Sequence, residues 1–166
     1  MPIVTMRANL TDSDIRTLIK GPTEEARAHA AHKICRCIED AELSAEERAH
    51  AEGILAIMAE DAAVLVRRAL AVALKNSPKL PRDIANKLAR DIETIALPVI
   101  LNSPMLTDAD LVEIVRTCPP SKQVAVASRE TLSTTVTGAI AEHAVPEAVQ
   151  RAIANDNAAF DEDGLE

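Results

Sequence analysis

The chain has 166 residues, a net charge of −8 and 48% apolar residues, which are ordinary values for one soluble globular domain. Trp and Tyr are absent and Phe160 is the single aromatic residue, which excludes the aromatic stacking surfaces of single-stranded nucleic-acid binders. The acidic charge also disfavours duplex DNA as a partner, because that affinity depends on neutralising phosphates.

Apolar residues recur at helical spacing along almost the whole chain, whereas the alternating runs typical of strands are missing. This periodicity predicts an all-α fold. No apolar window approaches the roughly 20 residues of a membrane-spanning helix, and the chain starts without a secretory signal, so we expect a cytoplasmic protein with no membrane contact. In chain order, the predicted helices cover residues 11–20, 23–40, 44–60, 62–76, 81–91, 92–102, 107–117, 120–130, 133–144 and 146–155.

Several predicted helices carry recognisable signals at or near their ends. Thr11 and Thr107 each precede an acidic residue at the third helical position, and Ser44 has the same spacing with Glu47. This spacing is typical of a capping box, in which two side chains satisfy backbone N–H groups at a helix start. Pro98 lies inside a predicted helix, which it is expected to end or kink.

A repeat with a displacement of 26 residues runs through the middle of the chain, since residues 66–80 align without a gap with residues 92–106. A third copy follows at the same step. The corresponding apolar positions are Leu74, Ile100 and Val126, and then Leu80, Leu106 and Leu132. Each unit is a helical hairpin, which buries its apolar face only by stacking against neighbours. We therefore predict one α-solenoid domain over residues 8–157 and an acidic flexible tail over residues 158–166.

The repeat unit Val66-Arg-Arg-Ala-Leu70, with its Asn-Ser-Pro-x-Leu turn and following Leu-Thr-Asp-x-Asp-Leu helix, resembles the HEAT-like and leucine-rich-repeat-variant class. Residues 97–111, 136–143 and 152–160 resemble an uncharacterised alphaproteobacterial domain-of-unknown-function family of such repeats. The resemblance covers roughly residues 61–160 and implies an architecture without established catalytic residues. Because it also implies an uncovered last hairpin, a homodimer formed through an end repeat is a further hypothesis.

One predicted helix carries His29, His32, Cys35 and Cys37, the only cluster of metal-ligand residue types. At about 100° per residue, Cys37 falls in the apolar stripe and the two histidines lie on the opposite side. The four side chains therefore cannot converge on one ion, and we expect no metal and no cofactor. Cys37 is expected in the core and Cys35 at the periphery. A small-ligand or metal-binding regulatory protein that uses the His29/His32 helix remains an alternative.

Charge is uneven along the chain. Residues 61–104 carry 7 Lys and Arg against 4 Asp and Glu, whereas both flanking segments are acidic. Such a basic hairpin suits an acidic protein surface. Exposed cations on helices are, however, commonly only solvated. In HEAT-like repeats the arginine at the position of Arg67 commonly bonds to a neighbouring repeat. The candidate partner-binding residues are Arg67, Arg68, Lys75, Lys79, Arg82, Asn86, Lys87 and Arg90.

Catalytic signatures are missing, because the chain has no glycine-rich phosphate loop, no His-Glu-x-x-His motif and no nucleophile elbow. We therefore predict a non-enzymatic scaffold or adaptor. Its partner is expected to be a protein or peptide, preferably acidic, bound along the groove lined by the second helix of each hairpin. A nucleic-acid binder that uses the basic hairpin of residues 67–90 is the second alternative, which the overall charge disfavours.

Overall fold

The computed structural model describes residues 12–161, so the predicted cap Thr11 and residues 162–166 of the predicted tail lie outside the described part. Within residues 12–161 the secondary structure is helical, with one isolated β-bridge. The helices are α2 (Asp12–Lys20), α3 (Glu24–Asp40), α4 (Ala45–Ala59), α5 (Val64–Leu74), α6 (Arg82–Ala89), α7 (Glu93–Asn102), α8 (Asp108–Thr117), α9 (Pro120–Ala127), α10 (Thr134–His143) and α11 (Pro146–Ala154). The predicted all-α class is confirmed. None of these helices combines the length and apolar character needed to cross a membrane.

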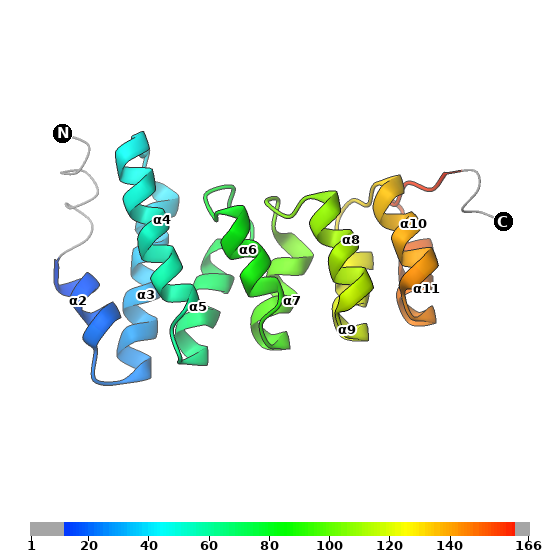
Figure 1. The fold of residues 1–166 in the computed structure, drawn as a ribbon. Helices are drawn as coiled ribbons and strands as arrows, with labels where there is room; N and C mark the ends of the chain where they lie inside the picture. Colours follow the sequence, from blue (N-terminus) through cyan, green and yellow to red (C-terminus); the bar gives the residue numbers. More distant parts are fainter. Residues whose placement is uncertain (1–11, 162–166) are drawn as a thin grey trace.

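The helices lie in two layers (Figure 1). In the first layer α3, α5, α7, α9 and α11 stand in a row, and each packs against the next. In the second layer α4 packs against α6, and α8 packs against α10. Helices that follow one another in sequence therefore alternate between the layers from α3 onward. α2 and α11 lie at opposite ends of the row (Figure 1).

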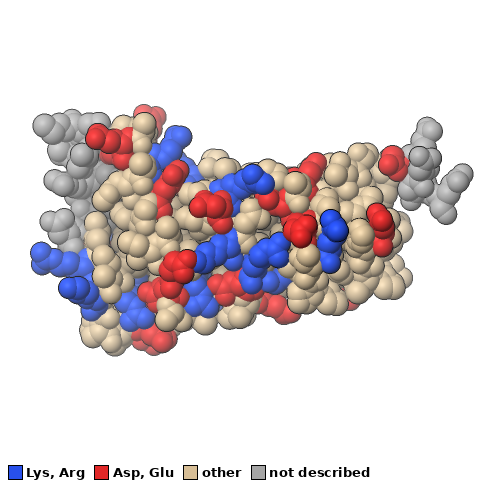
Figure 2. Space-filling model, in the orientation of Figure 1, with Lys and Arg blue, Asp and Glu red and all other residues tan. Residues whose placement is uncertain are grey.

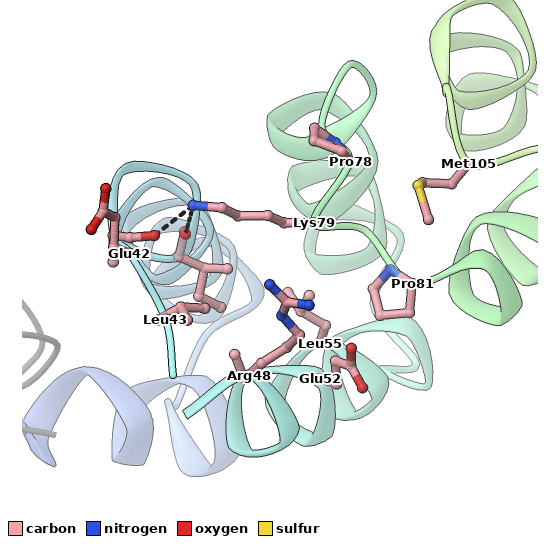
Figure 3. Close-up of a pocket in the computed structure, with 12 residues that line it drawn as sticks. Glu42, Leu43, Arg48, Glu52, Leu55, Pro78, Lys79, Pro81 and Met105 are labelled. Atoms are coloured by element: carbon pink, nitrogen blue, oxygen red, sulfur yellow. Dashed lines mark hydrogen bonds between the residues drawn. The ribbon is translucent and has the colours of Figure 1, made fainter. Parts of the chain in front are cut away.

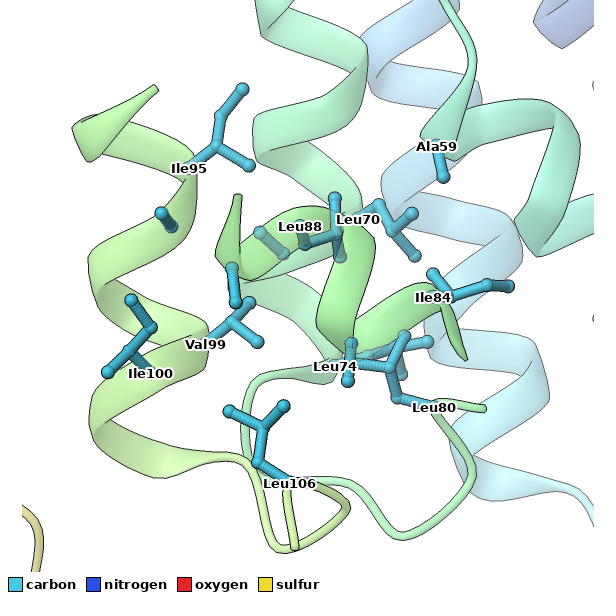
Figure 4. Close-up of a cluster of buried hydrophobic side chains, with 14 of the residues drawn as sticks. Ala59, Leu70, Leu74, Leu80, Ile84, Leu88, Ile95, Val99, Ile100 and Leu106 are labelled. Carbon is cyan, nitrogen blue, oxygen red and sulfur yellow. The ribbon is translucent and has the colours of Figure 1, made fainter. Parts of the chain in front are cut away.

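The core lies between the two layers and repeats along them. Leu74, Ile100 and Val126, which correspond at the displacement of 26 residues, all have an exposed fraction of 0%. The leucines that follow each first helix, such as Leu80 and Leu106, are also buried. Figure 4 shows these side chains gathered between α5, α6 and α7. Because burying one such side chain contributes about 1.5–3 kcal/mol, the repeated positions stabilise each hairpin through its neighbours.

The predicted capping boxes at Thr107 and Ser44 both form. Thr107 Oγ1 accepts the N–H of Asp110 at 3.2 Å, and Asp110 Oδ2 accepts the N–H of Thr107 at 2.9 Å. Ser44 and Glu47 make the same pair of bonds at the start of α4, at 3.2 and 3.0 Å. Pro98 does not end its helix, because α7 continues through it for another turn. A proline removes one N–H donor, and the buried residues on either side of it keep the helix in place.

The prediction for two cysteines of α3 is wrong. Cys35 has an exposed fraction of 0%, whereas Cys37 is only half-buried. Both α2 and α5 pack against α3, so the buried stripe is broader than one row and includes Cys35. Burial raises the pKa of the Cys35 thiol to about 12, and its Sγ lies 3.6 Å from the Sδ of Met58.

The chain folds back after α11. The N–H of Ala159 donates to the carbonyl oxygen of Leu132 at 2.8 Å, and Thr137 Oγ1 donates to the carbonyl oxygen of Ala159 at 2.6 Å. Phe160 is half-buried against the core. The packed part of the chain therefore extends into the segment that the sequence marks as a tail.

Candidate functional site

The predicted partner-binding residues do not lie on one surface. Two are on α5 in the first layer and one is its C-cap residue, one is in the following loop, and the last four are on α6 in the second layer or at its C-cap. In order these are Arg67, Arg68 and Lys75, then Lys79, then Arg82, Asn86, Lys87 and Arg90. Most of the cations among them bond within the protein, so their availability to a partner differs from one residue to the next.

Arg67 connects neighbouring hairpins. Its Nε lies 2.7 Å from Asp91 Oδ2 and its Nη2 lies 3.2 Å from Asp91 Oδ1. The third guanidinium nitrogen, Nη1, donates to the carbonyl oxygens of Asp61 and Ala62 at 2.8 and 3.1 Å. Burial opposes ionisation of Asp91, but the hydrogen bonds from Arg67 and from the N–H of Ile92, with the positive charges of Arg67 and Lys122, together outweigh it and lower the pKa of this carboxyl group. The nitrogens of the Arg67 guanidinium are thus used in bonds within the protein.

Lys79 closes the end of α3. Its Nζ donates to the carbonyl oxygens of Ile38, Glu39 and Ala41 at 3.1, 2.7 and 2.6 Å. The last carbonyls of a helix have no intrahelical partner and carry partial negative charge, so an ammonium group is a favourable ligand for them. All three N–H donors of Lys79 are used in this way, as Figure 3 shows in part.

Two arginines of the α6 region reach α8. Arg82 forms a bidentate pair with Asp110, with Nε–Oδ2 and Nη2–Oδ1 distances of 2.9 and 2.8 Å. Arg90 Nη1 donates to Thr117 Oγ1 at 3.2 Å near the other end of α8. The hydrogen bond from Arg82 holds the pKa of Asp110 well below its ordinary value. These polar bridges join the hairpins across the second layer.

The remaining predicted residues divide into bonded and unbonded ones. Lys87 pairs with Glu60 at the end of α4, and Asn86 Nδ2 donates to the carbonyl oxygen of Arg82 at 3.1 Å. Arg68 and Lys75 have no hydrogen-bond or ion-pair partner among residues 12–161. Among the cations of residues 61–104, only these two lack a bonding partner within the described part of the chain.

A cleft of about 640 Å³ opens between α4, the end of α3 and the loop that leads into α6 (Figure 3). Its lining is mainly apolar, with charged side chains around the opening. The apolar lining residues include Ile38, Leu43, Ala51, Leu55, Pro78, Pro81 and Met105, and the charged ones are Glu42, Arg48, Glu52 and Lys79. Arg48 and Glu52 project from α4 on the side of the cleft (Figure 3).

Arg48 and Glu52 differ from the cations described above, because neither side chain has a bonding partner among residues 12–161. Both are exposed at the mouth of the cleft. Of the lining residues, only Lys79 was predicted from sequence. The capping box at Ser44 does indicate where α4 begins and hence places Arg48 in its first turns, but no sequence pattern brings that turn beside Pro81.

His29 and His32 lie exposed on α3. In the part of the chain that the structure describes, no three His, Cys, Asp or Glu side chains come together as a metal site. The two histidines therefore lack a third described ligand of these types, and Cys35 is enclosed in the core on a different side of the helix.

Comparison with protein families gives one match. Residues 95–166 fit a family described as an uncharacterised protein conserved in bacteria (DUF2336). The matched segment begins inside α7 and includes α8 to α11. This match agrees with the resemblance to a bacterial domain-of-unknown-function family. Neither the curated proteins nor the solved structures contain a match to the chain.

Proposed function

We propose that the protein is a non-enzymatic scaffold that binds a protein or peptide partner along the face formed by α4, α6, α8 and α10. Its stacked hairpins are interpreted as a HEAT-like α-solenoid, an architecture that offers an extended binding surface. The observation that carries this proposal is the cleft of about 640 Å³ between α4 and the loop that leads into α6. We place this activity in the cytoplasm, in keeping with the expectation from sequence.

The chemistry of the cleft suits a peptide segment. Its volume lies in the range of about 300–1,000 Å³ that is common for binding pockets. Apolar residues such as Leu55 and Met105 can receive an apolar side chain, while Arg48 and Glu52 offer opposite charges that orient the bound segment. An acidic side chain beside the apolar one is expected to face Arg48.

The lining of the cleft supports binding in preference to catalysis. It contains no Ser, Thr, Cys or His side chain that could act as a nucleophile or as an imidazole base.

The charge distribution favours a protein over a nucleic acid. Arg82 is paired with Asp110, and Lys87 is paired with Glu60, so part of the basic hairpin is neutralised within the protein. Figure 2 shows Lys and Arg side chains interleaved with Asp and Glu over the middle of this face. A surface of alternating charge neutralises few phosphates, whereas it can match a protein surface with a complementary pattern.

The proposal is tested by site-specific cross-linking. A photoreactive residue placed at Glu52 in the full chain is activated in lysate, and the cross-linked partner segment is sequenced by mass spectrometry. We expect one partner segment that joins an apolar residue to an acidic one, and we expect Arg48→Glu to abolish the cross-link. Arg16→Glu, on an exposed position of α2 outside the proposed face, is the matched control. A cross-link that is unaffected by Arg48→Glu contradicts the proposed site.

A further inference from the structure

The basic hairpin leaves two cations available on α5. Residues 61–104 contain 7 Lys and Arg, and all but two of them are held by bonds within the protein. The remaining ones, Arg68 and Lys75, have no bonding partner among residues 12–161. Arg68 immediately follows Arg67, so two adjacent arginines have opposite roles: one holds the fold together and the other faces outward.

Arg68 and Lys75 alternate with apolar residues along one face of α5. Leu65, Arg68, Val72 and Lys75 are separated by three, four and three residues, which places them in one row on a helix. Leu65 and Val72 have exposed fractions of 38% and 45%. The row lies opposite the buried residues of α5, which are Val66, Leu70, Ala71 and Leu74.

The neighbouring helix extends this apolar surface. α7 packs directly against α5 in the first layer. Its Leu101 has an exposed fraction of 36%, and Leu97, one turn earlier, is half-buried. We call the surface formed by these six residues, Leu65, Arg68, Val72, Lys75, Leu97 and Leu101, the α5–α7 face. Exposed apolar residues grouped on adjacent helices mark interaction sites more often than scattered ones do.

The α5–α7 face is positively charged in an otherwise acidic chain. α5 contains no Asp or Glu, while the whole chain has a net charge of −8. The single acidic residue of α7, Glu93, accepts a hydrogen bond from Ser121 Oγ at 2.6 Å. A partner that covers this face must therefore bring apolar side chains and its own carboxylates.

We propose that the α5–α7 face binds an acidic amphipathic helix of a partner protein. A helix laid along α5 presents residues at spacings of three and four, which matches the spacing of Leu65, Arg68, Val72 and Lys75. Its apolar side chains meet Leu65, Val72 and the leucines of α7, and its Asp or Glu side chains pair with Arg68 and Lys75.

This surface is formed by α5 and α7, whereas the cleft is lined by α4, the end of α3 and the loops before α4, α6 and α8. The two sites therefore use different residues. A chain with both sites can hold two partners at once, which is the action of an adaptor. The proposal for the α5–α7 face does not depend on the cleft having the function proposed above.

The test uses a displayed library of random 16-residue peptides, selected on the full chain and counter-selected on Val72→Glu. Selected peptides are synthesised, and their binding is measured by fluorescence anisotropy. We expect the selected peptides to carry apolar residues at spacings of three and four, with Asp and Glu between them. Binding should weaken at least tenfold with the double variant Arg68→Glu and Lys75→Glu. Arg48→Glu and Arg116→Glu should leave it unchanged, which separates this site from the cleft.

The substituted positions are exposed or half-buried, and thermal unfolding followed by circular dichroism verifies that each variant remains folded. The proposal is overturned if counter-selection removes no peptide, or if charge reversal at Arg68 and Lys75 leaves binding intact. Two further results assign the face to something else. Sedimentation with phosphatidylserine vesicles that is lost in Val72→Glu assigns it to anionic lipid, and self-association lost in the same variant assigns it to a second copy of this chain.

Discussion

Arg82 and Asp110 form a bidentate ion pair that joins α6 to the first turn of α8, with N–O distances of 2.9 and 2.8 Å. The same carboxylate accepts the N–H of Thr107 and completes the capping box of α8. One side chain thus starts a helix and also attaches it to the preceding hairpin. Because the ion pair with Arg82 and the capping bond to Thr107 both depend on the negative charge of Asp110, its protonation weakens both.

This coupling predicts a pH dependence of stability. The folded-state pKa of Asp110 lies below its ordinary value of 3.8, so its stabilising contribution is complete above that value and is lost as the pH falls toward the folded-state pKa. We expect the difference between the urea midpoints of the wild type and of Asp110→Asn to be constant at higher pH and to shrink as the pH falls from about 4 to about 2. Curves that stay parallel over this range contradict the assignment.

The contrast between Arg67 and Arg68 is testable by matched substitutions. Arg67→Ala leaves the carboxylate of Asp91 without its guanidinium partner, which should lower the free energy of unfolding by about 1–3 kcal/mol. Arg67→Lys should recover only part of this loss, because lysine cannot form the bidentate pair. Arg68→Ala should change stability by less than about 0.5 kcal/mol. Urea unfolding compares the three variants, and equal losses for both alanine variants would show that Arg67 is ordinary surface.

Two glycines should respond in opposite ways to alanine. A Cβ added at Gly53 in α4 meets nothing within 4 Å, so Gly53→Ala should stabilise the protein by up to about 1 kcal/mol through helix propensity. A Cβ at Gly21 comes within 2.5 Å of the carbonyl oxygen of Thr17, so Gly21→Ala should be destabilising. The melting temperatures of both variants, compared with that of the wild type, show whether each substitution stabilises or destabilises the protein. A lower melting temperature for Gly53→Ala would reveal a contact on this face of α4.

The three cysteines should differ in reactivity. The Cys35 thiol is buried, and burial raises its pKa to about 12, so it should resist alkylation at neutral pH in the folded protein. Cys37 and Cys118 are half-buried and should react first. Alkylation followed by peptide mass spectrometry distinguishes the sites, with urea-unfolded protein as the control in which all three react. Early labelling of Cys35 would contradict its placement in the core.

The all-α class, the helices and their caps were predictable from sequence, because they depend on neighbouring residues. The box formed by Thr107 and Asp110 needs only a spacing of three residues and an apolar pattern after it. The burial of Leu74, Ile100 and Val126 followed from their recurrence every 26 residues. Each of these features depends on neighbouring or regularly spaced residues, so the spacing of residues in one sequence is enough to predict it.

Tertiary structure decided which side chains are available for binding. Arg67 and Arg68 are adjacent and chemically identical, yet only Arg67 reaches Asp91, which lies 24 residues away. The burial of Cys35 in place of Cys37 depends on α2 and α5 both packing against α3. The cleft beside α4 likewise forms only because one hairpin packs against the next. Periodicity indicates which face of a helix is apolar, but the rotation and spacing of stacked hairpins determine which charges meet a partner within the fold and which remain free.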